Sequence, residues 1–213
     1  MNKKSKILLV IASVLLVFTF FFPLWSITLV APQYPDGITM YIWVNQITGD
    51  TPSTLQNVNI LNHYVGMKFI VPDSIPELQY FPYIIIGCVA LGLLFSLGKI
   101  KHGALIWAGV LSILGLLGIY DFYLWMYDYG HNLSPTAPIK IPGMVYQPPL
   151  FGTKLLLNFE ATSLPAMGSL FLGLSILVAY YAGFVNIIDK KENTNKNEKI
   201  DENKQELEDV QSV

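Results

Sequence analysis

Histidine and methionine side chains lie close together at one point of the sequence, and their chemistry suits a soft metal ion. His63 and Met67 are four residues apart, so in a helix they share one face. Imidazole nitrogen and thioether sulfur are both ligands that Cu(I) accepts. The pair therefore indicates a copper site. The alternative is a hydrogen-bonded histidine beside a methionine that fills a core.

A second pair of the same types follows later in the chain. His131 and Met144 lie in a segment rich in proline and glycine, so a copper site made of His63, Met67, His131 and Met144 requires the two segments to meet. The sequence has no phosphate-binding loop, no Gly-x-Ser-x-Gly and no His-Glu-x-x-His. We therefore predict a protein that is not an enzyme, with no catalytic residues and no cofactor other than copper.

Two more reactive side chains lie in apolar surroundings. Cys88 is the only cysteine, and a small buried hydrophobe is its expected role. Asp121 lies near the end of an apolar stretch, where an acid must face water, the inside of a bundle or a partner. A hydrated acid at the membrane surface, a proton or ion pathway and a helix-packing hydrogen bond are the three alternatives for Asp121.

Four long stretches with almost no charge run through the sequence, and Cys88 and Asp121 lie in two of them. The chain has 213 residues, of which 53% are hydrophobic and 13% are charged, whereas a soluble domain has about 25% charged residues. A helix needs about 20 apolar residues to cross a bilayer. We predict spans at about residues 7–25, 81–98, 103–125 and 161–188. The predicted fold is an all-α membrane bundle of four transmembrane helices over residues 1–188.

Lysine placement predicts the orientation of the spans. All 13 basic residues are lysines. Ten of them lie at the N-terminus, in the turn with Lys99 and Lys101, or in the C-terminal tail. The other three are Lys68, Lys140 and Lys154. Because basic residues favour the cytoplasmic side, both termini are predicted in the cytoplasm. Loops 26–80 and 126–160 then lie in the periplasm, on the outer side of the inner (cytoplasmic) membrane. The first span is predicted to be an anchor rather than a cleaved signal, because no Ala-x-Ala site follows it.

The two loops and the tail differ in composition. Residues 38–44 are rich in β-branched and aromatic side chains between turns, which predicts a short strand. Ser53 or Thr54 is predicted to cap an amphipathic helix, with apolar residues at helical spacing. The second loop has too many prolines and glycines for long regular elements. Residues 189–213 are rich in Lys, Glu, Asn and Asp and are predicted to form a disordered cytoplasmic tail.

Three strings in these loops are similar to those of a known family. Ala31–Gly37, Leu61–Met67 and Tyr127–Pro149 resemble the NosB-like small membrane proteins found beside nitrous-oxide reductase in bacterial gene clusters. The resemblance extends over about Leu24–Gly168 and excludes the tail. It implies an accessory role in nitrous-oxide reduction, and hence in denitrification, with the reductase or its maturation proteins as partner. Because the reductase matures outside the cytoplasm and contains copper, the implied role is maturation or the supply of copper or electrons.

Two other functions stay open at the level of sequence. A redox or quinol-linked membrane subunit that holds haem needs histidines within the spans, and no histidine lies in the middle of a predicted span. A small transporter binds its substrate near the middle of the membrane, where the predicted spans offer few polar groups. The net charge of −2 and the lack of a basic cluster indicate that nucleic acid is not a partner.

Overall fold

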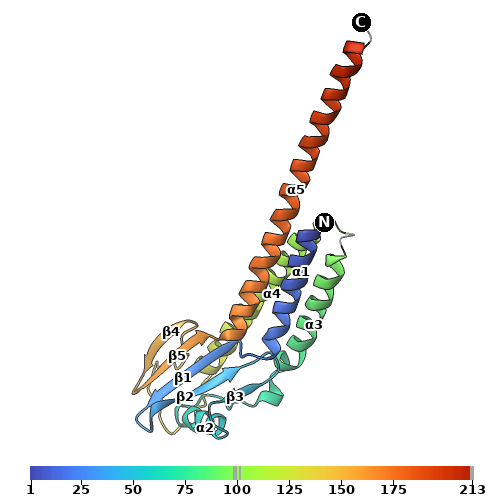
Figure 1. Ribbon diagram of the computed structural model, residues 1–213. Helices are drawn as coiled ribbons and strands as arrows, with labels where there is room; N and C mark the ends of the chain where they lie inside the picture. The colour runs from blue at the N-terminus through green and yellow to red at the C-terminus, as the bar shows by residue number, and fades with distance from the viewer. Residues whose placement is uncertain (98–99, 101, 212–213) are drawn as a thin grey trace.

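The computed structural model describes residues 1–97, 100 and 102–211 and has two layers (Figure 1). Helices α1 (Lys3–Val17), α3 (Pro76–Ser96), α4 (Gly103–His131) and α5 (Met167–Gln211) form a bundle. A β-sheet and helix α2 (Thr54–Val65) form a second layer at one end, which we call the sheet domain. Lys99 and Lys101, which contribute to the predicted orientation, lie outside the described residues, as do residues 98, 212 and 213.

Long apolar helices make this a multi-pass membrane protein. In the part of the chain that the structure describes, α3, α4 and the first part of α5 are long and apolar enough to cross a membrane. Helix α3 begins at Pro76 rather than at residue 81, since proline fits the first turn of a helix. Helix α4 continues beyond the predicted end at residue 125 as far as His131. Its middle leaves large apolar side chains exposed, including Leu116 and Leu117.

The first predicted span is only partly helical. Helix α1 ends at Val17 and a 3-10 turn, Phe18–Phe20, follows it. Together they measure about 28 Å, close to the roughly 30 Å of a hydrocarbon core. The predicted end at residue 25 is wrong, because Trp25 begins a strand. Helix α1 packs against α3 and α5, and its outward side chains, such as Ile7 and Val14, are apolar.

The two predicted loops join in one antiparallel sheet. Strands β1 (Trp25–Ala31), β2 (Tyr34–Ile42) and β3 (Ile47–Gly49) come from the first loop, and β4 (Gly152–Leu156) and β5 (Phe159–Pro165) from the second. The strand order is β3-β2-β1-β5-β4, so β1 pairs with both β2 and β5. The fold is therefore mixed, and the all-α prediction is wrong. The predicted start of the fourth span at residue 161 is also wrong, because Ala161 lies in β5.

The sheet has one apolar face and one face rich in hydroxyl groups. Side chains alternate along a strand, and four alternate residues of β1 are buried: Trp25, Ile27, Leu29 and Ala31. This face packs with α2 and the end of α4 to form the core of the sheet domain. On the opposite face, Thr28 and Thr39 lie 2.9 Å apart through their hydroxyl oxygens. The predicted strand and amphipathic helix of the first loop are confirmed as β2 and α2.

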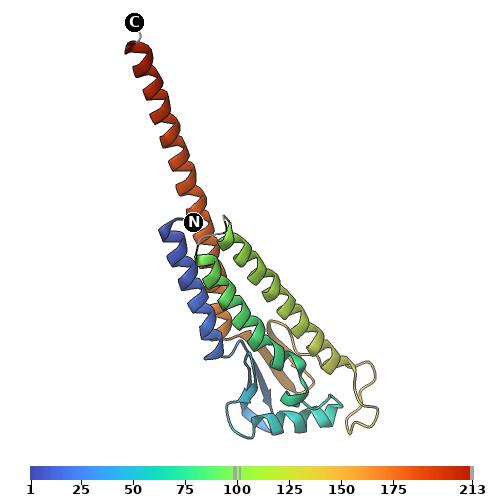
Figure 2. The ribbon, with the colours of Figure 1, turned by 90° about the vertical axis from the view of Figure 1, so that its right-hand side faces the viewer.

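Small residues let the bundle helices approach closely. A side-chain carbon on Gly92 of α3 would lie 2.2 Å from the Oγ of Ser13 in α1 and 2.8 Å from the ring of Trp107 in α4. The Nε1 of Trp107 donates a hydrogen bond to the backbone oxygen of Cys88 at 2.7 Å, and Cys88 is buried, as predicted. Small residues commonly mark contacts between membrane helices. Gly92 therefore lies where α1, α3 and α4 meet, and Figure 2 shows α3 between the other two helices.

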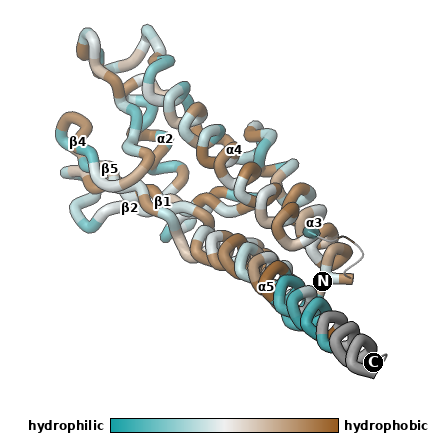
Figure 3. Tube along the Cα trace, turned by 90° about the horizontal axis from the view of Figure 1, so that it is seen from above, coloured by the Kyte–Doolittle hydropathy of each residue, from teal (hydrophilic) through white to brown (hydrophobic). Residues whose placement is uncertain are grey.

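Helix α5 continues beyond its apolar part into the charged segment. Figure 3 shows the change from hydrophobic to hydrophilic residues along this helix. The helix reaches Gln211, whereas the sequence predicts disorder from residue 189. Lys, Glu and Gln are good helix formers. A helix that already exists in the bundle can also extend without a second nucleation step, which explains the difference.

Candidate functional site

His63 and Met67 line one cleft, but not because they share a helical face. Helix α2 ends at Val65, and Gly66 turns the chain with a φ of +82°, a conformation that glycine adopts without steric cost. Met67 therefore lies beyond the helix, and the prediction that both side chains lie on one helix is wrong. Both nevertheless line an open cleft of about 230 Å³, which we call the outer cleft.

The second loop forms the opposite wall of the outer cleft. The Ser134 backbone N–H donates to the Gly66 oxygen at 2.7 Å, and the Ile139 N–H donates to the Tyr64 oxygen at 2.9 Å. These bonds hold the loop after α4 against the end of α2. The two loops therefore meet at this cleft, as a shared site requires. The residues that the second loop contributes to its wall are Ser134, Thr136 and Ala137.

One cationic side chain borders the outer cleft and is paired. The Nζ of Lys68 lies 2.6 Å from a carboxylate oxygen of Asp128 near the end of α4. Both side chains are exposed, so the pair contributes only about 0–1 kcal/mol to stability. Its local effect is electrostatic, because Asp128 offsets the positive charge of Lys68 that would otherwise oppose a cation in the cleft.

His131 and Met144 lie at the end of α4 and in the loop that follows it. His131 ends α4, and its ring stacks on Tyr127 with 3.8 Å between ring centroids. Met144 is partly buried in the following loop, where its N–H donates to the Ile141 oxygen. Neither residue lines the outer cleft. The four-residue copper site stays a prediction, and the donors that share a cleft are His63 and Met67. Among the described His, Cys, Asp and Glu residues, no group of three or more could hold a metal ion.

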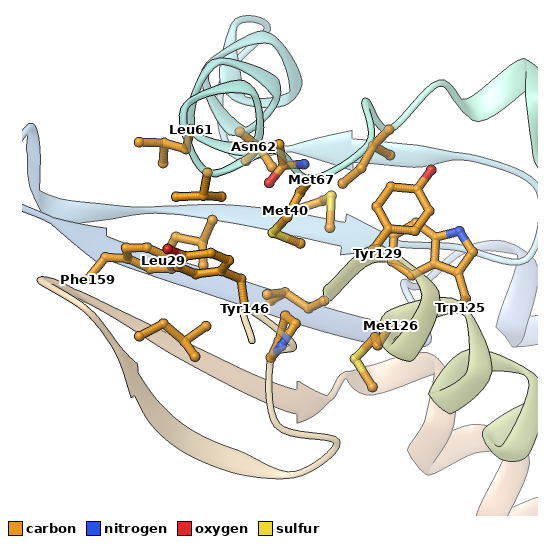
Figure 4. Close-up of a pocket in the computed structure, with 16 residues that line it drawn as sticks. Leu29, Met40, Leu61, Asn62, Met67, Trp125, Met126, Tyr129, Tyr146 and Phe159 are labelled. Carbon is orange, nitrogen blue, oxygen red and sulfur yellow. The ribbon is translucent and has the colours of Figure 1, made fainter. Parts of the chain in front are cut away.

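A second, mainly apolar cavity lies between the sheet, α2 and the end of α4 (Figure 4). This inner cavity has a volume of about 50 Å³. Met40 of β2 and Met126 of α4 line it and are 3% and 1% exposed. Sequence reasoning did not select either residue as a site residue, because they are far apart in the chain and no local spacing connects them. Met67 lines both the inner cavity and the outer cleft.

Tyr146 adds a buried hydroxyl group to the wall of the inner cavity. Its side chain is 1% exposed, and its Oη has no hydrogen-bond partner among the described residues. Tyr129 lines the same cavity, but its hydroxyl donates to the Phe69 oxygen at 3.1 Å. A buried polar group without a partner costs about 1–3 kcal/mol. The wall of the inner cavity therefore contains a buried polar group that the described residues leave without a hydrogen bond.

Asp50 fixes the first turn of α2, the helix that helps to form both cavities. Its carboxylate accepts hydrogen bonds from the Thr54 hydroxyl and, at 3.1 Å, from the Thr39 backbone N–H. Burial raises the pKa of Asp50, but hydrogen bonds from Thr54, Thr39 and Thr51 outweigh burial and hold the pKa below its usual range. The negative charge also lies near the N-terminus of α2, where the helix dipole favours it.

Asp121 lies on α4 and is partly buried. Glu77 in the first turn of α3 is close enough to interact with it electrostatically. Acids from two neighbouring helices therefore lie near the sheet domain. The hydrated acid, the proton or ion pathway and the packing role stay predictions for Asp121.

The bundle and the sheet domain together define a multi-pass membrane protein with a mixed sheet-and-helix domain at one end. No family model matches the sequence, and no curated protein matches it. The functional proposal therefore relies on the geometry and donor chemistry of the outer cleft and on the resemblance of the loop sequences.

Proposed function

We propose that this protein is a non-enzymatic membrane accessory protein that supplies Cu(I) to a periplasmic copper enzyme or supports the maturation of that enzyme. The observation that carries the proposal is the outer cleft, where His63 and Met67 lie together. Imidazole and thioether groups are donors that suit Cu(I). The cleft is open, so a partner protein can reach an ion held there, which suits transfer rather than storage.

The proposed topology has four crossings, with α1 and its 3-10 turn as the first. Both termini are then cytoplasmic, and the sheet domain is periplasmic. Two observations support this arrangement. The N-terminus and the charged half of α5 lie away from the sheet domain (Figures 1 and 2). Lys3, Lys4 and Lys6 lie at that same end of α1, which is the cytoplasmic end by the positive-inside rule.

The proposed partner is nitrous-oxide reductase or one of its maturation proteins. The resemblance of the loop sequences to NosB-like proteins supports this choice. The strings that carry the resemblance contribute residues to the sheet domain, including His63 and Met67 of the outer cleft. A partner on the periplasmic side would therefore meet the part of the chain on which the resemblance rests.

Copper binding to the purified full-length protein tests the proposal. We expect His63→Ala combined with Met67→Leu to weaken Cu(I) binding by about tenfold or more, equivalent to about 1.4 kcal/mol. Binding is measured anaerobically by competition with a chromogenic Cu(I) chelator. His131→Ala with Met144→Leu is measured in parallel, because these residues lie outside the outer cleft, and we expect a smaller effect.

His102→Ala is the matched control, because His102 precedes α4 at the end of the bundle away from the sheet domain. Its Cu(I) affinity should equal that of the unaltered protein. Equal affinities for the unaltered protein and the His63/Met67 variant would disprove the copper role of the cleft. The copper content of nitrous-oxide reductase from cells that lack this protein tests the partner, and we expect that content to fall.

A further inference from the structure

A group of exposed apolar side chains borders the outer cleft. Ile60 and Tyr64 of α2, Phe69 after α2 and Ile139 in the loop after α4 are each between 43% and 56% exposed. Phe69 itself lines the cleft, and the Ile139 backbone N–H donates to the Tyr64 oxygen at 2.9 Å. Ile60 lies one turn before Tyr64, on the same face of α2. We call these four residues the cleft rim.

The position of the cleft rim exposes it to water rather than to lipid. Helix α2 and the loop after α4 lie at the end of the molecule away from the N-terminus and the charged part of α5 (Figures 1 and 2). In the proposed topology this end is the farthest from the bilayer. Single apolar residues on a surface are ordinary, but a contiguous apolar patch in water marks a contact site.

The size of the cleft rim suits a brief contact. A whole aromatic side chain covers about 150–250 Å², so four large side chains that are half exposed offer roughly 300–500 Å². A stable complex buries about 800 Å² on each partner, whereas transient complexes bury less than about 600 Å² on each. The rim is therefore too small for a permanent dimer, and it has the size that a partner needs to receive an ion and leave.

The charge beside the cleft rim favours a different protein over a second copy of this chain. Lys140 directly follows Ile139, is exposed and takes part in no salt bridge among the residues that the structure describes. Asp128, the acid beside the outer cleft, is already paired with Lys68. In a symmetric dimer the same patch lies on both sides of the interface, so a second copy would add another lysine and no free acid. A partner surface that carries an acidic residue complements the rim instead.

We propose that the cleft rim is the docking surface for a periplasmic partner protein whose contact face is apolar and carries an acidic residue. This proposal rests on the proposed function and specifies how the partner of the outer cleft is recognised. The apolar contact holds the partner's own copper ligands at the mouth of the cleft. The ion then passes as Cu(I) from His63 and Met67 to those ligands by ligand exchange, without any change of oxidation state.

Two double variants separate docking from metal binding. Ile60→Gln with Ile139→Gln makes the rim polar at two positions that do not line the cleft, so the purified full-length variant should keep its Cu(I) affinity and its melting temperature. Val30→Gln with Leu155→Gln is the matched control. Both of its positions are exposed apolar residues on the opposite, hydroxyl-rich face of the sheet.

The measurement is the copper content of nitrous-oxide reductase from cells in which each variant replaces the unaltered protein. We expect the Ile60/Ile139 variant to lower that content at least twofold while the variant itself is present at normal abundance. The Val30/Leu155 control should leave the content unchanged. Lys140→Glu should also lower it, because it reverses the charge that the partner's acid complements.

Three results would contradict the proposal in different ways. A full copper content with the Ile60/Ile139 variant overturns the docking surface, while a loss of copper with the His63/Met67 variant would still support the proposed function. A dimer of the purified protein that the Ile60/Ile139 variant converts to monomers overturns the docking surface in favour of a second copy. If cells that lack the protein fill the reductase with copper normally, both proposals are wrong.

Discussion

Two tyrosines on the wall of the inner cavity have different energetic roles. Tyr129 donates its hydroxyl hydrogen to the Phe69 oxygen, whereas the Tyr146 hydroxyl has no partner within the described part of the chain. Both rings contribute to the same apolar lining. Because the two hydroxyl groups differ in their hydrogen bonding, the same substitution at both positions compares the loss of a hydrogen bond with the removal of a buried unpaired group.

We expect Tyr146→Phe to stabilise the protein by about 1 kcal/mol, because it removes a buried unpaired hydroxyl. Tyr129→Phe should destabilise it by about 1 kcal/mol, because it removes a hydrogen bond. Thermal unfolding in detergent, followed by tryptophan fluorescence, measures both changes. If Tyr146→Phe is instead clearly destabilising, the hydroxyl has a partner, and the inner cavity holds an occupant that bonds to it.

The sequence located part of the candidate site at the level of residues. His63 and Met67 were selected by donor chemistry and spacing, and they do line one cleft. The helical argument for the pair failed because Gly66 ends α2 between them. Met40 and Met126 were missed as site residues, since each lies in an apolar segment and only the tertiary fold brings them to the same cavity.

Helix α2 takes its position from contacts at both of its ends. Asp50 and Thr54 fix the first turn next to β2, and the loop after α4 packs against the last turn. The outer cleft lies at the C-terminal end, and the inner cavity lies beneath the helix. A change at the first turn is therefore expected to alter the geometry of both cavities.

Asp50→Asn should lower stability near neutral pH by less than about 1 kcal/mol, given that the carboxylate is largely exposed. The folded state lowers the pKa of Asp50, so its contribution is fully present above the ordinary value of about 3.9. That contribution is lost as the pH falls below this value through the folded pKa. Melting temperatures measured from pH 7 to pH 3 should therefore converge for the two proteins in acid.

Thr54→Val provides the matched partner for this measurement, because it removes the hydroxyl donor to Asp50. In a double-mutant cycle, the effect of Asp50→Asn should shrink when Thr54 is already valine. A constant difference between Asp50→Asn and the unaltered protein across the whole pH range would show that the hydrogen bonds do not depend on the charge of Asp50.

Hydropathy predicted the long helices well but concealed two strands. The spans of α3 and α4 follow from long uncharged runs, and α2 follows from its cap and helical spacing. Strands β1 and β5 directly adjoin bundle helices, so their apolar residues continue the hydrophobic runs of α1 and α5. Pro23 and Pro165 were the available signals, since proline interrupts regular hydrogen bonding. The alternation of apolar and hydroxyl residues in β1 was a further signal of a period of two, but it lies at the end of a long uncharged run.

At the scale of the whole molecule, the helical bundle separates two ends that differ in composition. The bundle places the sheet domain at one end and the N-terminus with the charged part of α5 away from it (Figure 1). Both segments that connect bundle helices at the sheet end contribute strands to the same sheet. The proposed orientation therefore fixes the side of the membrane for every site residue at once.

Single cysteines test this orientation in a Cys88→Ala background. Asn158→Cys places a thiol in the exposed turn between β4 and β5, and Asn195→Cys places one in the charged part of α5. In intact spheroplasts, a membrane-impermeant maleimide should label position 158, while position 195 should react only after permeabilisation. The reverse pattern would place His63 and Met67 in the cytoplasm and contradict the proposed function.

The pairing of β1 with β5 has a consequence for biogenesis. Strand β1 leaves the ribosome early, whereas its second neighbour is made only just before the last bundle helix. Until then, one edge of β1 stays open, and open edges promote association with other chains. A chain whose synthesis stops after α3 therefore exposes the edge of β1 that normally pairs with β5. A chain with a wrongly inserted helix cannot place β5 beside this edge. Completion of the sheet therefore requires that the segment after α4 lies on the same side of the membrane as β1.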